Sequence, residues 1–225
     1  MVSHLSYNSF QIANGSSSQN DDNPSHAIQI CCAWNDKLAD GVLTYKIDGG
    51  NSDSQQAINN AIEEWNSKIM GIKIEESTND NTPADIDIKI SSKSSRVTHA
   101  TNTIVGDNGI ADGKKIKLAQ PGEAIISFDS KGLINHVDIT VSTRALGSSF
   151  DTVKLESIAK HEIGHAYGIG HTDFANDLMS PILTDRTDTD LSECDINGIE
   201  AANQWKETST ANNFPHAPTL QFLRC

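Results

Sequence analysis

The stretch HEIGHAYGIGH, residues 161–171, decides how the rest of the chain is interpreted. In a helix, residues four positions apart lie one turn above each other, so His161 and His165 present two imidazoles to one point. A glycine past the last helical turn adopts positive φ easily, so Gly168 predicts a sharp helix end that returns His171 to the same point. Three protein ligands with a fourth position left for water are the ligand set of a catalytic zinc ion.

Glu162 follows the first of these histidines and stands one position off the ligand face. Its carboxylate is therefore expected beside the metal, where a water molecule would bind, and not on the metal itself. A structural zinc site usually closes all four positions with protein ligands and has no use for such a carboxylate. The pattern favours a catalytic zinc, with the three histidines as ligands and Glu162 as the general base.

The composition bounds what the whole chain can be. Its 225 residues include 17 Lys and Arg against 30 Asp and Glu, which gives a formal net charge of −13. An acidic field of this size repels nucleic acid and anionic membrane surfaces, so neither is expected as a partner. The apolar runs are shorter than the roughly 20 residues that span a bilayer. The first residues show no basic segment followed by an apolar one, so no signal peptide is visible.

Three regions are predicted along the chain. Residues 1–30 are rich in Ser, Asn, Asp and Gln and poor in large apolar residues, which predicts a flexible polar arm. Residues 31–208 contain the periodic segments and are expected to form one catalytic domain. Residues 209–225 show no periodicity and are expected to form a tail.

Periodicity within residues 31–208 indicates both strands and helices. Apolar residues at three- and four-residue spacing predict helices at about 54–70, 152–167 and 192–205, with Ser192 as an N-cap. Alternating or β-branched runs predict strands at 42–47, 84–90, 124–128 and 137–141. Residues 91–121 carry glycines among polar residues and are expected to be loop with short strands. This order of elements indicates one α/β or α+β domain.

Four cysteines are too few to build a disulfide scaffold at this chain length: Cys31, Cys32, Cys194 and Cys225. Adjacent cysteines bond to each other only with strain, and pairing across the chain is geometrically easier. The sequence leaves the connectivity open.

With its HExxHxxGxxH pattern, the sequence resembles the metzincin metalloproteases and, within them, the matrixins. The tight turn at Met179, eight residues past the third histidine, is similar to the Met-turn of these proteins. The resemblance covers about Trp34 to Trp205. Besides the histidine motif, four groups of residues carry the resemblance: Trp34 together with residues 43–47, Ala61 together with Trp65, residues 84–86, and residues 191–199 (LSECDINGI).

The resemblance implies an α/β (α+β) zincin-like fold. This fold has a twisted, mostly parallel five-stranded sheet with an antiparallel edge strand and three helices, and zinc lies at the base of a cleft that binds an extended peptide. It implies a secreted, monomeric zinc endopeptidase that acts on proteins or peptides. Met179 would form an apolar floor beneath the ligands. The edge strand would pair with substrate, and residues 180–184 would wall the pocket for the side chain after the scissile bond. The candidate cleft residues are Ala124, Ile125, Ile126, Pro181 and Ile182.

The sequence also departs from the matrixin pattern. The structural-zinc loop has no clear counterpart, and His99 and His136 are interpreted as ordinary surface or loop histidines. Calcium is a further candidate cofactor, with Asp85 and the loop 107–109 as possible oxygen donors, although turn formation is the commoner role of such residues.

Cys194 stands where matrixins carry the first of two aspartates that open the last helix. A bridge from Cys31 or Cys32 to Cys194 would replace a salt link of the family with a covalent one, whereas the alternative is that these cysteines are simply buried as small apolar residues. The thiol-based latency motif of the family is absent, because the residues around Cys31 and Cys32 lack its Arg and Gly.

Two other functions fit the same residues. A non-proteolytic zinc-binding or adhesion module could keep the three histidines, but it would not need Glu162. An exopeptidase or narrowly specific processing peptidase would need a group that captures a peptide terminus, and the sequence shows no obvious one. Cleavage of internal bonds in an unfolded protein separates these functions from the endopeptidase.

Overall fold

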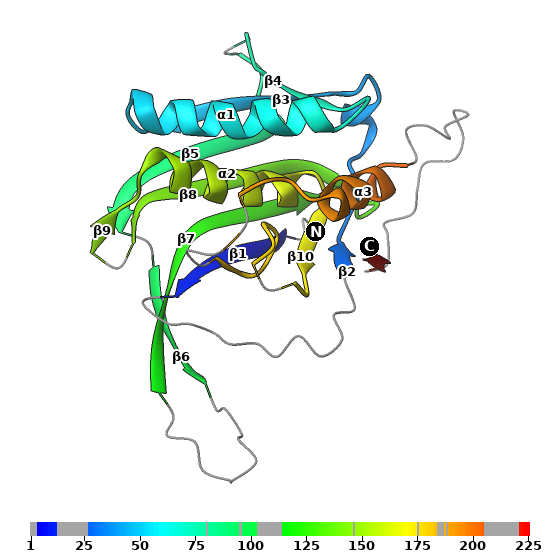
Figure 1. The fold of residues 1–225 in the computed structure, drawn as a ribbon. Coiled ribbons are helices and arrows are strands. Elements are labelled where there is room, and N and C mark those ends of the chain that lie inside the picture. Colours follow the sequence, from blue (N-terminus) through cyan, green and yellow to red (C-terminus); the bar gives the residue numbers. More distant parts are fainter. Residues whose placement is uncertain are drawn as a thin grey trace.

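A curved mixed sheet forms the framework of the protein, seen in a computed structural model (Figure 1). The structure describes residues 4–12, 27–79, 81–94, 96–102, 114–145, 147–174, 176–183, 187, 189–204 and 221–225. Five strands correspond to the sheet that the family resemblance implies. In spatial order these are β4 (Lys73–Glu76), β3 (Val42–Gly49), β5 (Ile86–Ser94), β8 (Ile134–Ala145) and β7 (Lys114–Phe128). The first four are parallel, and β7 is antiparallel to β8. The predicted fold class is therefore confirmed.

Four further strands extend this sheet among the described residues. They are β1 (His4–Ile12), β6 (Arg96–Asn102), β9 (Ser148–Ser149) and β11 (Ile182–Leu183). β6 and β7 form an antiparallel pair that projects from the body of the sheet in Figure 1. The segment 91–121 was expected to be loop with short strands, yet it supplies the end of β5, all of β6 and the first half of β7. The loop 107–109 lies outside the described residues.

Three α-helices lie within the described residues, close to their predicted positions: α1 (Ser52–Lys68), α2 (Thr152–Ala166) and α3 (Glu193–Ala202). A 3-10 turn, η1 (Asp36–Leu38), precedes β3. α1 and α2 pack against each other, and α2 also lies against β7 and β8. Each helix begins at a side chain that accepts a hydrogen bond from the first turn, and Ser192 caps α3 as predicted. No helix in the described part of the chain is both long and apolar enough to cross a membrane.

Two buried tryptophans fix the position of α2. Trp65 Nε1 donates a hydrogen bond to Lys160 O at 3.0 Å, and Trp34 Nε1 donates one to Ala166 O at 2.7 Å. Both indole rings are fully buried, and Trp65 stacks obliquely on Tyr167 with ring centroids 5.6 Å apart. Because buried indole N–H groups need acceptors, these bonds hold the helix in one place relative to the elements around it.

A second, three-stranded sheet corrects the prediction that both ends of the chain lack structure. It consists of β10 (Ile169–Thr172), β2 (Ala27–Ile30) and β12 (Gln221–Arg224), in that order. Residues 4–12 and 27–30 are thus strands, although residues 1–30 were expected to form a flexible arm, and the predicted tail contains β12. Polar composition did not reveal these strands, because their backbones are paired by segments distant in the sequence.

Two disulfides decide the connectivity that the sequence left open. Cys31 is bonded to Cys32, and Cys194 is bonded to Cys225, so neither the hypothesised bridge from Cys31 or Cys32 to Cys194 nor its alternative of buried free cysteines is found. The amides of both Cys31 and Cys32 donate to the carbonyl of Gly168, so the pair lies against the end of α2. Cys225 reaches α3 because β12 pairs with β2, against which α3 packs.

Candidate metal centre

Helix α2 ends where the sequence predicted and for the predicted reason. The amides of Tyr167 and Gly168 donate to carbonyls of the last turn, and Gly168 has φ of +101°. A side chain at Gly168 would also overlap the carbonyl oxygen of Cys32, so glycine is required by both conformation and space. The chain then reverses into β10, which carries His171 back towards the helix.

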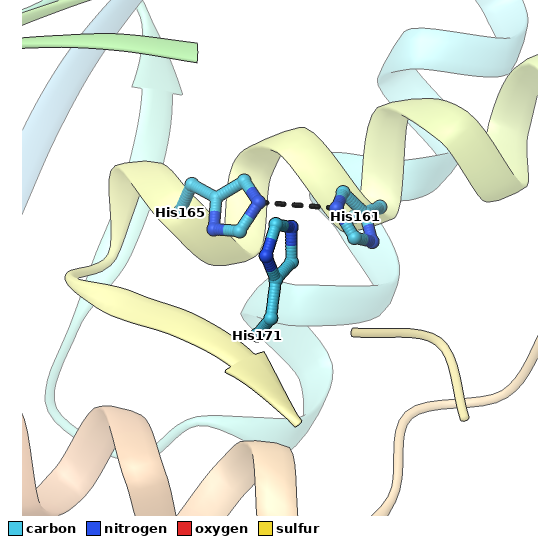
Figure 2. A group of neighbouring side chains, drawn as sticks. All are labelled: His161, His165 and His171. Atoms are coloured by element: carbon cyan, nitrogen blue, oxygen red, sulfur yellow. Dashed lines mark hydrogen bonds between the residues drawn. The ribbon is translucent and has the colours of Figure 1, made fainter. Parts of the chain in front are cut away.

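The histidine triad, defined as His161, His165 and His171, brings three imidazole rings together (Figure 2). One ligand nitrogen from each ring lies within 4.8 Å of the others. The Nε2 atoms of His161 and His165 are 3.0 Å apart. The fold therefore places the three predicted ligands at one point, from a helix and from the strand that follows it.

Backbone carbonyls orient two of these rings. His161 Nδ1 lies 2.7 Å from Leu178 O, and His165 Nδ1 lies 2.9 Å from Ile169 O. Carbonyl oxygens only accept hydrogen bonds, so both Nδ1 atoms carry the proton and both Nε2 atoms present lone pairs to each other. Two lone pairs 3.0 Å apart repel unless a cation lies between them. This donor set, with its orienting carbonyls, is the one that zinc prefers in proteins.

Burial keeps the triad in the form that binds metals. Desolvation, with a contribution from the nearby His171, lowers the pKa of His161 to about 3. Desolvation lowers the pKa of His171 to about 4. The pKa of His165 is also lowered, first by burial and then by the other two rings. All three imidazoles are therefore neutral near pH 7 and available as ligands.

Glu162 is fully buried on α2 and faces strand β7. A Cβ atom on Gly122 of β7 would overlap Glu162 Oε1 and would lie 2.7 Å from its Cδ. The carboxylate therefore lies directly on the backbone of β7, in space that only a glycine leaves open. Sequence reasoning missed Gly122, although a glycine inside a strand does signal close approach of another group.

The turn that contains Met179 lies directly beside the triad. Met179 is fully buried, and a Cβ atom on Gly164 of α2 would lie 2.6 Å from its Sδ. Asp177 shapes the turn, because its carboxylate accepts from the Met179 amide at 2.8 Å. The neighbouring carbonyl of Leu178 is the one that orients His161. The turn thus packs against the ligand helix and also holds one ring in place.

The predicted cleft residues fall into two groups on either side of β1. Ala124, Ile125 and Ile126 belong to β7, where Ala124 and Ile126 are fully buried and Ile125 is half-buried. Pro181 and Ile182 follow the turn of Met179, and Ile182 begins β11. The order β11-β1-β7 in the sheet shows that β1 lies between the two groups.

Asp85, a candidate calcium ligand, is engaged in bonds within the fold. Its carboxylate accepts from the amide and the hydroxyl of Thr44, both at 2.8 Å, and pairs with Lys37 Nζ at 3.1 Å. These contacts join β3 to the start of β5. They give the carboxylate a role within the fold.

His136, interpreted as an ordinary histidine, belongs to a second group of metal-binding residue types. Its Nε2 lies 3.7 Å from Asp87 Oδ2 and 3.5 Å from Asp138 Oδ1, while Nδ1 lies 3.2 Å from Ala84 O. Both carboxylates are more than half exposed. Exposed pairs of this kind contribute little to stability. The side chain of His99 lies outside the described residues.

Comparison with known proteins identifies the family of the chain. The family model described as matrixin matches residues 33–203, and the chain therefore belongs to the matrixin family. The interstitial collagenase of Bos taurus is 29% identical over 194 residues, which cover 84% of this chain and 36% of that protein. The interstitial collagenase of Equus caballus is 31% identical over 169 residues, which cover 71% of this chain and 31% of that protein. The chain thus spans about a third of the length of these relatives.

A solved structure described as the GM1-bound form of the ECX AB5 holotoxin is also similar. It is 13% identical, with a TM-score of 0.46, over 79% of this chain and 88% of that one. Family membership and the described triad support a metalloprotease.

Proposed function

We propose that this chain is a zinc-dependent endopeptidase that hydrolyses internal bonds of proteins, with the histidine triad as metal ligands. The observation that carries the proposal is the pair of Nε2 atoms, 3.0 Å apart and both in the acceptor tautomer, on a helix that also carries the buried carboxylate of Glu162. A non-proteolytic zinc module would need the triad but would gain nothing from Glu162 in that position.

The residues of the chain have separate roles in this reaction. A zinc ion held by the triad would supply Lewis acidity to the scissile carbonyl and lower the pKa of a water molecule towards about 7. Glu162 takes a proton from the attacking water and delivers it to the nitrogen of the leaving amine. Gly122 leaves the space that this carboxylate occupies. Met179 packs beneath the ligand helix and excludes water from that side.

The proposal also covers the substrates, the oligomeric state and the location of the enzyme. The two longer relatives are named as collagenases, so proteins or peptides are proposed as substrates here. We further propose that the enzyme is monomeric and acts outside the cell. Calcium is not assigned to any described group.

The test compares the wild-type chain with Glu162→Gln, using casein or gelatin as the substrate and measuring the zinc content of both proteins. We expect about one zinc per chain in both, and a fall in cleavage rate of roughly 10²- to 10⁴-fold in Glu162→Gln. Glu200→Gln, an exposed glutamate of α3, is the matched control and should keep wild-type activity. Bound zinc without cleavage in any variant would overturn the proposal and favour a binding module.

A further inference from the structure

Strand β1 occupies the position where a bound peptide is expected. Its two neighbours in the sheet are β7, predicted to pair with substrate, and β11, which begins within the predicted pocket wall. β1 is antiparallel to β7 from His4 opposite Ser127 to Ile12 opposite Leu118, and parallel to β11. An extended peptide that adds to a sheet edge makes this kind of backbone ladder.

The register of β1 places one peptide bond beside the candidate catalytic groups. Ser9 is paired with Gly122, and Gly122 is the residue against which Glu162 lies. Phe10 is paired with Ile182, in the segment predicted to wall the pocket for the residue after the scissile bond. Two independent pairings, one on each side of β1, therefore point to the bond between Ser9 and Phe10.

Two further observations agree with this placement. The ladder between β1 and β7 is irregular between Ser9 and Gln11, so the backbone around Phe10 departs from regular pairing. A bulge of this kind re-aims the chain and frees a peptide group from the ladder. Helix α2, which carries the triad and Glu162, also contacts β1 directly.

We propose that β1 is an intramolecular substrate and that the chain hydrolyses its own Ser9–Phe10 bond. This inference rests on the proposed endopeptidase function. The oxygen of one water molecule bonds to the carbonyl carbon of Ser9, and the bond from that carbon to the nitrogen of Phe10 breaks. Glu162 transfers one proton of the water to this nitrogen, and the second proton is released from the new carboxyl group of Ser9 at neutral pH.

The same geometry predicts which peptides the enzyme cleaves and what cleavage of β1 does to the sheet edge. The bond cleaved precedes a large aromatic residue and follows a small polar one, so other peptides with this pattern are expected substrates. While it is intact, β1 occupies the edge of β7 on which such peptides would pair. Cleavage after Ser9 separates the part of β1 that precedes Phe10 from the rest of the domain and opens that edge to other chains.

The experiment follows the intact mass of the full-length chain, purified with a chelator and then supplied with zinc. We expect a product that begins at Phe10, formed with a first-order rate constant that does not change over tenfold dilution. Glu162→Gln should not be processed, nor should it be cleaved when mixed with wild type. Phe10→Gly should be processed at least about tenfold more slowly, because glycine removes the large aromatic residue that the proposal requires after the cleaved bond. Phe222→Gly, an exposed residue of β12, is the matched control and should be processed at the wild-type rate.

Casein cleavage in the same samples separates the two proposals. Cleavage of casein by a chain whose N-terminus stays intact, or is cut at another bond, would overturn this inference and leave the endopeptidase standing. A processing rate that rises with protein concentration would overturn the intramolecular step. If the zinc-loaded chain cuts neither casein nor itself, the proposed function fails and this inference fails with it.

Discussion

Gly122→Ala is expected to disable the enzyme without unfolding it. Gly122 does not have a positive φ, so the backbone of β7 accepts alanine there without strain. The obstacle is the side chain of Glu162, because the new Cβ would lie 2.7 Å from its Cδ and 2.8 Å from its Cγ. Carbon atoms in contact prefer about 3.5 Å or more, so the carboxylate must move by roughly 1 Å.

The magnitudes distinguish an effect on catalysis from an effect on folding. Replacing glycine at a compatible position stabilises a protein by about 0.4–1 kcal/mol, through the unfolded chain. Forcing Glu162 off its rotamer costs about 0.5–1.5 kcal/mol. The free energy of unfolding should therefore change by no more than about 1 kcal/mol. A 1 Å displacement of a catalytic group costs on the order of 10²-fold in rate, and this loss should appear in kcat.

The assay measures kcat and KM on a peptide substrate, together with zinc content and denaturant unfolding. The double variant Gly122→Ala with Glu162→Gln is the control. If both changes act through the carboxylate, the double variant should be no slower than Glu162→Gln alone. A Gly122→Ala enzyme with kcat within about threefold of wild type would refute the placement of Glu162 on β7. So would additive losses in the double variant.

Two further predictions concern stability. The triad has lowered pKa values in the fold, so below the ordinary histidine pKa of 6.5 the unfolded chain binds more protons than the folded one. The free energy of unfolding of the metal-free protein should therefore decrease as pH falls from 7.5 to 5.5, by at most about 1.4 kcal/mol per pH unit for each histidine. A free energy of unfolding that stays constant over this range, measured in chelator, would contradict the burial of the triad. Removal of the Cys194–Cys225 disulfide, which closes a separation of 31 residues, should lower the free energy of unfolding by about 3.7 kcal/mol. Urea unfolding of the double Cys→Ala variant measures this loss, and an unchanged midpoint would show that the bridge stabilises nothing.

The sequence determined the features that depend on near neighbours in the chain. The four-residue spacing of His161 and His165 requires a helix to bring them together, and α2 does so. Gly168 ends the helix, because only glycine adopts its positive φ without strain and leaves room for the carbonyl oxygen of Cys32. Alternation along residues 84–90 predicted a strand, since side chains of a strand point to opposite faces in turn.

Only the tertiary structure decided which distant segments meet. Residues 1–30 look polar and unstructured, yet the strands within them gain their partners from β7, β10, β11 and β12. Nothing local distinguishes Cys225 from Cys31 as a partner for Cys194, because the choice depends on where β12 returns. Gly122 shows its role only when α2 lies against it. Periodicity records which face of an element is buried, whereas the partner that covers that face is fixed by the path of the whole chain.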